Sequence, residues 1–345
     1  MHKGHVLIIE DLDQLLDELR KTNTFSSVTI LVDENTNAHC LPLLSSFSRN
    51  LSFFQIKSGE EEKNIQTAIQ IWDALTRFKA DRKSLLINLG GGVIGDMGGF
   101  CAATFKRGIG FVQIPTTLLS MVDASVGGKL GIDFQEYKNH IGVFKIPEAV
   151  LIYPGFLKTL DKRELRSGFA EIIKHCLIAD ANKWNEIVSK NWTKLDLTDL
   201  IRHSVAIKSH VVEVDPEERG LRKILNFGHT IGHAVESFYL PQVGKKLLHG
   251  EAIAIGMVAE AWLSYHKGFI SLEDSEAIKS YILSIYPKVG IPVSEFEAIL
   301  SLTSQDKKNE GDVLLFSLLN TIGEANYNIP IVKEEMFNAL AYYLD

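Results

Sequence analysis

Two histidines four residues apart stand in a helical pattern in the C-terminal half of the chain. His229 and His233 belong to the segment NFGHTIGH, and residues four apart share one face of a helix. Such a pair resembles part of the HExxH zinc site of peptidases. Thr230 stands where that motif has its glutamate base, so the pattern argues against a peptidase.

Two other segments carry residue types that bind metals. His249 begins the helical segment HGEA, and Glu171 stands in an otherwise apolar helical pattern with Lys174 on the same face. One carboxylate and two imidazoles suit a catalytic zinc ion with a position open to substrate. Any single histidine is more often a hydrogen-bonded core residue. Spacing alone does not show that Glu171, His229 and His249 converge.

A glycine-rich turn follows the apolar run at 84–89. Gly90, Gly92 and Gly95 satisfy G-x-G-x-x-G between this predicted strand and a predicted helix at 97–105. Backbone N–H groups at a helix start can approach a pyrophosphate where no Cβ intervenes. The turn therefore predicts a dinucleotide site, with a tight structural turn as the alternative.

The residue that would bind the ribose is not in its usual place. No acidic residue ends the next predicted strand, at 110–114. Asp33 ends the earlier strand at 28–32 and is a candidate by position, although a turn role is about as good an explanation. Thr116, Thr117 and Lys129 offer groups for phosphate or ribose oxygens, but each is more often part of a turn.

Several cations stand beside glycine, asparagine or apolar residues rather than in charged surface runs. They are Lys129, Lys138, Lys174, Lys208, Arg222 and Lys307. Buried cations need anionic partners. The net charge of -7 argues against a nucleic acid or an anionic membrane as partner. A small substrate with phosphate and carboxylate groups fits better, and Arg222 suits bidentate pairing, while a solvated loop position stays open for each lysine.

The elements that position these residues change in kind along the chain. A length of 345 residues suggests two domains. Strand signals alternate with helical ones as far as Pro154, and helical periodicity dominates from Thr159 onward. We therefore predict an α/β domain with a parallel sheet at 1–154, followed by a mostly helical domain at 155–345. Ligands are expected in a cleft between them.

The predicted elements are five strands, at 28–32, 53–56, 84–89, 110–114 and 150–153, and helices at 64–78, 163–178, 197–212, 224–238, 250–266, 272–285 and 333–344, with a short apolar segment at 313–319. Three cysteines without a CxxC pair fit a reducing compartment. No signal-peptide core and no membrane-spanning apolar run is evident, so we expect a soluble cytoplasmic protein.

Taken in order, these motifs resemble the 3-dehydroquinate synthase family of sugar phosphate cyclases. The resemblance runs from about Asp33 to Asn309. Besides the segments above, it includes SGE at 58–60, VDASVGGK at 122–129, LNFGHTIGHA at 225–234 and DKK at 306–308. It departs at Leu130, where threonine is common, and in a somewhat longer segment between His233 and His249.

The resemblance implies a Rossmann-like NAD-binding domain at 1–154 and a helical domain at 155–345 that binds metal and substrate. It also implies a role for each matching residue. NAD would bind Asp33, Glu60, Lys63, Gly92, Val93, Ile94, Gly95, Asp96, Thr116, Thr117, Lys129, Lys138, Phe156, Leu157, Lys158 and Thr159. Zinc, or alternatively cobalt, would bind Glu171, His229 and His249. Substrate contacts and catalysis would come from Asp123, Lys129, Asn139, Lys174, Lys208, Arg222, Asn226, His233 and either Lys307 or Lys308. Arg107 would reach the phosphate bound by the other subunit of a homodimer.

The reaction implied is a lyase step of the shikimate pathway. It converts 3-deoxy-D-arabino-heptulosonate 7-phosphate, a phosphorylated sugar acid, into 3-dehydroquinate and phosphate. NAD accepts a hydride and later returns it, so no net oxidation occurs. The metal polarises a substrate hydroxyl, and His233 is a plausible proton carrier.

Three other functions remain to be compared with this one. Another sugar phosphate cyclase, such as 2-deoxy-scyllo-inosose synthase, takes glucose 6-phosphate, which lacks the carboxylate that Lys174, Lys208 and Arg222 favour. A metal-dependent polyol dehydrogenase needs no phosphate-binding cluster and accumulates NADH. A catalytically dead binding protein would lack a ligand or a lysine, and none is missing.

Overall fold

The structure is a computed structural model that describes residues 4–48, 51–135, 137–303 and 313–345. It contains two compact units, Met1–Leu165 and Arg166–Asp345, and each is described by itself. The division falls later in the chain than the predicted domain boundary after residue 154, which stays a prediction.

The first unit is built on a parallel sheet, as the sequence predicted. Its six strands follow the order β1-β8-β5-β4-β2-β3, and every neighbouring pair is parallel. The central strands are mostly apolar and buried because both faces of the sheet are covered. The strands are β1 (His5–Ile8), β2 (Val28–Asp33), β3 (Ser52–Ile56), β4 (Leu85–Gly90), β5 (Gly110–Pro115) and β8 (Ala149–Ile152).

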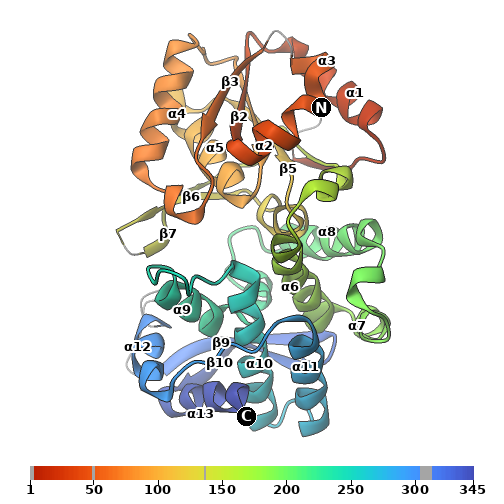
Figure 1. The fold of residues 1–345 in the computed structure, drawn as a ribbon, viewed down its shortest axis with the longest axis vertical. Helices are drawn as coiled ribbons and strands as arrows, with labels where there is room; N and C mark the ends of the chain where they lie inside the picture. Colours follow the sequence, from red (N-terminus) through yellow and green to blue (C-terminus); the bar gives the residue numbers. More distant parts are fainter. Residues whose placement is uncertain (1–3, 49–50, 136, 304–312) are drawn as a thin grey trace. The chain divides into compact units, whose positions relative to one another are not determined.

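Helices and one hairpin complete this unit (Figure 1). The helices are α1 (Leu12–Arg20), α2 (Glu34–His39), α3 (Ser45–Ser48), α4 (Ile65–Arg77) and α5 (Gly92–Thr104). The antiparallel hairpin of β6 (Lys129–Phe134) and β7 (Tyr137–Phe144) packs against α5. The glycine-rich turn thus leads from β4 directly into α5, in the strand–turn–helix order that a dinucleotide site requires.

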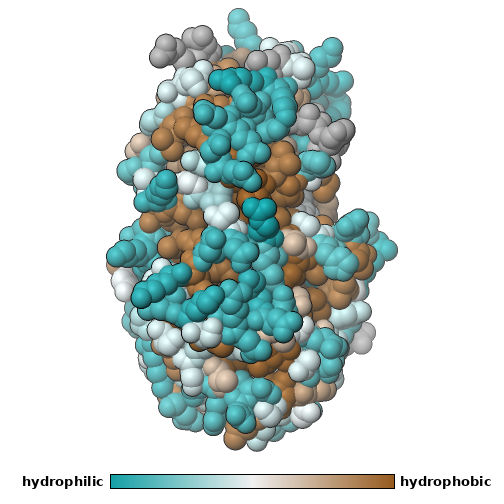
Figure 2. Space-filling model, turned by 90° about the vertical axis from the view of Figure 1, so that its right-hand side faces the viewer, coloured by the Kyte–Doolittle hydropathy of each residue, from teal (hydrophilic) through white to brown (hydrophobic). Residues whose placement is uncertain are grey.

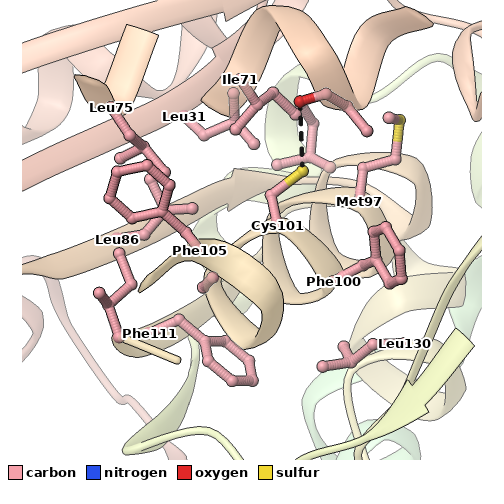
Figure 3. Packing of buried hydrophobic residues seen from close by; sticks show 14 of the residues in the cluster. Leu31, Ile71, Leu75, Leu86, Met97, Phe100, Cys101, Phe105, Phe111 and Leu130 are labelled. Carbon is pink, nitrogen blue, oxygen red and sulfur yellow. Dashed lines mark hydrogen bonds between the residues drawn. The ribbon is translucent and has the colours of Figure 1, made fainter. Parts of the chain in front are cut away.

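The core of the first unit lies where α4 and α5 meet the sheet. Figure 3 shows Leu31, Leu86 and Phe111 from the strands packed with side chains from both helices. Leu130 on β6 belongs to the same core, and a Cβ added at Gly99 would lie 2.4 Å from its Cδ2 atom. Leu130, which stands where the family commonly has threonine, therefore packs against α5 as part of this core.

The second unit is mostly helical, also as predicted. Its helices are α6 (Lys162–Ala179), α7 (Ala181–Val188), α8 (Leu197–Val214), α9 (His229–Tyr239), α10 (His249–His266), α11 (Leu272–Ile285), α12 (Val293–Thr303) and α13 (Lys333–Leu344). The central helix α10 packs against α9, α11 and α13 and is buried along most of its length. A helix apolar on all sides belongs inside a domain, and α10 takes that position.

Two predictions for the second unit were incomplete. The helix expected at 224–238 is interrupted, because Gly228 has a left-handed φ of +79° and separates a 3-10 turn (Leu221–Asn226) from α9. The apolar segment at 313–319 is strand β9 (Val313–Thr321), which pairs with a strand the sequence did not reveal, β10 (Glu324–Val332).

None of the helices in the described residues has the length and apolar character needed to cross a membrane. On the face drawn in Figure 2, hydrophilic and hydrophobic residues are mixed.

The three cysteines provide a test of this packing. Cys40, Cys101 and Cys176 are at most 4% exposed, and burial raises the pKa of Cys40 and Cys176 to about 12 and that of Cys101 still further. Thiolates are the reactive form. We expect no labelling by a thiol reagent in native buffer and labelling of all three after unfolding in urea. Rapid labelling of the folded protein would contradict the packing.

Candidate active site

Helix α6 carries a carboxylate and an ammonium group into the core of the second unit. Glu171 is 0% exposed and Lys174 is 1% exposed, and the two side chains form an ion pair one turn apart. A buried charge is tolerated when it is paired, because an uncompensated one costs several kcal/mol. Glu171 is one candidate ligand of a metal ion, and Lys174 is a cation beside it.

The imidazoles of His229 and His249 lie next to the Glu171 carboxylate, and the imidazole of His233 lies next to both of them. Glu171 Oε1 lies 3.5 Å from His229 Nε2 and 3.4 Å from His249 Nε2. The rings of His229, His233 and His249 each offer a nitrogen within 4.8 Å of the others. The structure therefore brings together the three predicted ligands and places His233 next to them. One carboxylate and two or three imidazole nitrogens are donors that Zn²⁺ accepts, so the residues present fit such an ion.

The start of α10 is fixed directly against α6. The Gly250 backbone N–H donates to Ser167 Oγ at 2.9 Å, and a Cβ added at Gly250 would lie 1.8 Å from the Ser167 carbonyl oxygen. Ser167 stands about one turn before Glu171 on α6, and His249 immediately precedes Gly250. Only glycine permits this approach, which sets His249 beside Glu171.

Hydrogen bonds on the other ring nitrogens orient two of the imidazoles. His229 Nδ1 lies 3.1 Å from the Phe227 carbonyl oxygen, and His249 Nδ1 lies 3.3 Å from Glu236 Oε2. Both rings therefore face Glu171 with Nε2, the arrangement in which an outer partner fixes the tautomer of a metal ligand. Sequence reasoning missed Glu236, which shares α9 with His229.

The two imidazoles differ in electrostatic environment. Burial and the neighbouring Lys174 ammonium hold the pKa of His229 well below its ordinary value, which favours the neutral ring that binds metals. Burial alone would also lower the pKa of His249. The Glu236 and Glu171 carboxylates outweigh burial there and raise it to about 9.

A buried carboxylate on α10 holds the start of α9. Glu260 is 0% exposed, and its two oxygens accept the backbone N–H groups of Gly228 at 2.6 Å and Ile231 at 3.1 Å. The first N–H groups of a helix lack partners within it, and a negative charge there is favourable. Glu260 thereby secures the turn that presents His229. Sequence reasoning missed it, although an acidic residue within an apolar helix was a visible signal.

We expect Glu260→Gln to destabilise the second unit by about 2–3 kcal/mol. The amide has one acceptor oxygen in place of two, and its NH₂ group would face a backbone donor. Urea unfolding followed by far-UV circular dichroism measures the change. Glu273→Gln on α11, at an exposed position, is the matched control and should unfold like the wild type. Equal midpoints for all three proteins would show that the Glu260 contacts contribute nothing.

Two further cations predicted to bind the substrate, both in the second unit, are also buried. Lys208 on α8 is 6% exposed and Arg222 is 2% exposed. Arg222 Nη1 donates to the Pro216 carbonyl oxygen at 2.7 Å, and Asn226 Nδ2 donates to Glu218 Oε1 at 2.9 Å. Glu218, with a φ of +59°, is another residue that sequence reasoning missed. Lys307 and Lys308 lie outside the described residues.

In the first unit, the glycine-rich turn lines a hollow. Its lining residues are Gly90, Gly91, Gly92, Gly95, Gln113, Pro115, Ser120, Ala124 and Ser125. Helix α5 begins at Gly92, so its first N–H groups lie at this hollow, and a Cβ at Gly91 would be 3.1 Å from Thr117 Cγ2. Gln113 Nε2 donates to the Gly95 carbonyl oxygen at 2.9 Å. Glycines around a helix start suit a pyrophosphate, so the hollow fits the phosphates of NAD.

The other residues predicted to bind NAD differ in their contacts and in their exposure. Asp33 caps α2, with its Oδ1 accepting the Thr36 N–H at 2.7 Å, which is the turn role left open above. Glu60 and Lys138 form an ion pair of 3.3 Å. Thr116, Phe156 and Leu157 are buried, whereas Lys158 and Thr159 are exposed. Val93, Ile94 and Asp96 lie on the first turns of α5.

The predicted substrate residues of the first unit lie on three segments. Asp123 stands in a π-helical turn, Ser120–Ala124, and is partly buried. Lys129 begins β6 and is exposed, and Asn139 lies on β7. Arg107 is exposed with a φ of +69°, in the turn after α5.

Comparison with known proteins identifies the family of this chain. Two family models match, 3-dehydroquinate synthase N-terminal over residues 53–167 and 3-dehydroquinate synthase C-terminal over residues 168–309. A 3-dehydroquinate synthase of Parabacteroides distasonis is 39% identical, over 99% of this chain and 98% of that protein.

Solved structures share the fold. A 2-epi-5-epi-valiolone synthase of Streptomyces hygroscopicus with NAD⁺ and Zn²⁺ bound has a TM-score of 0.86 and 26% identity, covering 100% of this chain and 97% of that one. A 2-deoxy-scyllo-inosose synthase complexed with carbaglucose-6-phosphate, NAD⁺ and Co²⁺ has a TM-score of 0.83 and 23% identity, covering 97% and 95%. From the two matching family models and the full-length relative, the chain belongs to the 3-dehydroquinate synthase family.

Proposed function

We propose that the protein converts 3-deoxy-D-arabino-heptulosonate 7-phosphate into 3-dehydroquinate and phosphate, as a carbon–oxygen lyase of the shikimate pathway. The observation that carries this proposal is the buried Glu171 carboxylate, with His229 and His249 within 3.5 Å and the Lys174 ammonium paired to it. This cluster offers a metal site and an anion-binding group side by side. Family membership supplies the substrate.

The cofactors are NAD and a divalent metal, Zn²⁺ or Co²⁺. The related synthases with NAD⁺ and these ions bound support this choice. When bound, NAD accepts and returns a hydride at one substrate carbon, and the metal polarises the hydroxyl group there. Glu171, His229 and His249 would hold the metal, and the N–H groups at the start of α5 would bind the NAD pyrophosphate.

The buried cations would bind the anionic groups of the substrate. Lys174, Lys208 and Arg222 are each at most 6% exposed, and a charge-assisted hydrogen bond is stronger where water is excluded. Arg222 presents a planar fork that suits a carboxylate or a phosphate. His233 would transfer protons to and from the substrate through Nε2 or Nδ1. Its ring lies next to a metal ligand, because its centroid is 5.1 Å from that of the His229 ring.

The competing functions differ in substrate and in the fate of NADH. Purified protein would be incubated in separate reactions with the sugar acid phosphate, with glucose 6-phosphate and with glycerol, each with NAD and Zn²⁺. We expect dehydroquinate from the first and no turnover of the others. Turnover of glucose 6-phosphate alone would identify a different sugar phosphate cyclase, and net NADH from glycerol would identify a polyol dehydrogenase.

We further propose a cytoplasmic homodimer in which Arg107 of one subunit binds the phosphate held by the other. Its exposure and position after α5 leave the guanidinium accessible. Mixing and refolding inactive Arg107→Ala with inactive Glu171→Gln tests this, because hybrid dimers would then contain one intact site. Partial recovery of activity is expected. A mixture as inactive as its components would place Arg107 in its own subunit's site.

A further inference from the structure

A buried lysine in the first unit joins the predicted cofactor loop to the predicted substrate hairpin. Lys63 follows a 3-10 turn, Glu60–Glu62, and its side chain is 5% exposed. Its Nζ donates to Asp96 Oδ2 on α5 and to Asn139 Oδ1 on β7, each at 2.6 Å. Three segments far apart in sequence thus meet at one ammonium group.

This contact fixes the orientation of the Asn139 amide. An asparagine side chain has an acceptor oxygen on one side and an NH₂ donor on the other. Because the oxygen faces the ammonium, the Nδ2 group points away from it. The reversed amide would set N–H donors against a cation and would lose a charge-assisted hydrogen bond. Asn139 is therefore held as a donor toward any ligand.

The surrounding backbone supports the same arrangement. The Lys63 carbonyl oxygen accepts the Asp133 N–H at 2.7 Å, and Asp133 Oδ1 accepts the Asn139 N–H at 2.7 Å. Asn139 has a φ of +50°, a left-handed conformation that its neighbours must hold in place. Burial alone would lower the pKa of Lys63, but Asp96 and Glu60 raise it above its ordinary value. The ammonium therefore stays charged across the range in which an enzyme works.

We propose that Lys63 is a positioning residue that orients Asn139 so that Nδ2 donates to an acceptor oxygen of the phosphorylated sugar acid. The identity of that ligand rests on the proposed function. Lys63 acts on the substrate through Asn139, and it ties the orientation of Asn139 to Asp96 at the start of α5. We call the contact of Lys63 with Asp96 and Asn139 the junction. It connects the part of the site that would bind NAD with the part that would bind the substrate.

Two variants separate the donor from the junction. Asn139→Asp keeps an oxygen facing Lys63 but removes the NH₂ donor, whereas Lys63→Met removes the ammonium and leaves the donor free to turn. We expect each to raise KM for the sugar acid phosphate roughly 10- to 100-fold, the loss of one hydrogen bond to a charged group. NAD affinity should fall only in Lys63→Met, because only that change releases Asp96.

Non-additivity is the decisive readout. In an Asn139→Ala background, Lys63→Met should add little to the rise in KM, since the amide it orients is already gone. Lys83→Met, at an exposed lysine of the same unit, is the matched control and should behave like the wild type. A wild-type KM for Asn139→Asp, or fully additive effects of Lys63→Met and Asn139→Ala, would overturn the proposal.

A second measurement keeps this inference separate from the proposed function. If the wild-type protein does not turn over the sugar acid phosphate, the proposed function fails, and the junction is tested by unfolding instead. The same double-mutant cycle is then measured by urea unfolding of the first unit. A coupling between Lys63 and Asn139 beyond experimental error supports the junction, and a coupling of zero overturns it.

Discussion

Glu171→Gln is expected to weaken divalent metal binding by more than about 100-fold and, as a result, to abolish turnover. Loss of an outer partner of a metal ligand already costs 10- to 100-fold, and Glu171 is proposed as a ligand itself. Glutamine has nearly the same size, but its neutral amide is a poor ligand and leaves the Lys174 ammonium, 1% exposed, without its carboxylate. Competition with a zinc indicator dye measures the affinity apart from activity.

Glu273→Gln is the control for this change, because it makes the same substitution at an exposed position in the same unit. It should bind zinc and turn over substrate like the wild type. The loss of the buried charge pair also predicts a lower melting temperature for Glu171→Gln, so binding is compared well below that temperature. If folded Glu171→Gln binds zinc with wild-type affinity, Glu171 is not a metal ligand.

Gly256→Ala should destabilise the second unit by about 3 kcal/mol or more. The added Cβ would lie 1.9 Å from the Gly228 carbonyl oxygen and 2.7 Å from the Gly232 backbone nitrogen. Both atoms belong to the backbone at the start of α9, so no side chain can rotate away to make room. Helix α9 must therefore move away from α10, and His229 moves with it. Urea unfolding and zinc titration both report the change.

Gly290→Ala gives the matched comparison, because no atom lies within 4 Å of a Cβ built there. It should unfold like the wild type or slightly later, since alanine reduces the freedom of the unfolded chain. Gly256→Ala unfolding at the wild-type urea concentration would mean that α9 and α10 pack less closely than described.

The arrangement of strands could be predicted where the sequence pattern is unambiguous. Strands β2, β4 and β5 are mostly apolar runs, each with one buried polar residue inside the run, that end in Asp, Gly or Pro, and they form the middle of the sheet. Strand β1 is only four residues long, and β10 is mostly exposed and contains Pro330, so neither gave a signal. The break in the expected helix at 224–238 depends on one glycine, Gly228, whose left-handed conformation a periodicity count does not detect.

The residue types of the candidate metal site were visible in the sequence, but their convergence was not. Glu171 reaches His249 because Gly250 packs on Ser167, and His229 is presented by a turn that Gly256 and Glu260 hold. Glycines in helices are visible in a sequence, whereas the atoms they approach are known only from the fold. The same reason hid the contact of Lys63 with Asn139, which lie 76 positions apart.

The central claim is that NAD cycles within one turnover, and phosphate release with limiting NAD tests it most directly. The purified protein would receive Zn²⁺, excess 3-deoxy-D-arabino-heptulosonate 7-phosphate and NAD at a concentration far below that of the substrate. We predict phosphate release far in excess of the NAD supplied, no accumulation of NADH, and loss of the reaction on adding a metal chelator. Release that stops after one equivalent of NAD, with matching NADH, would contradict the account.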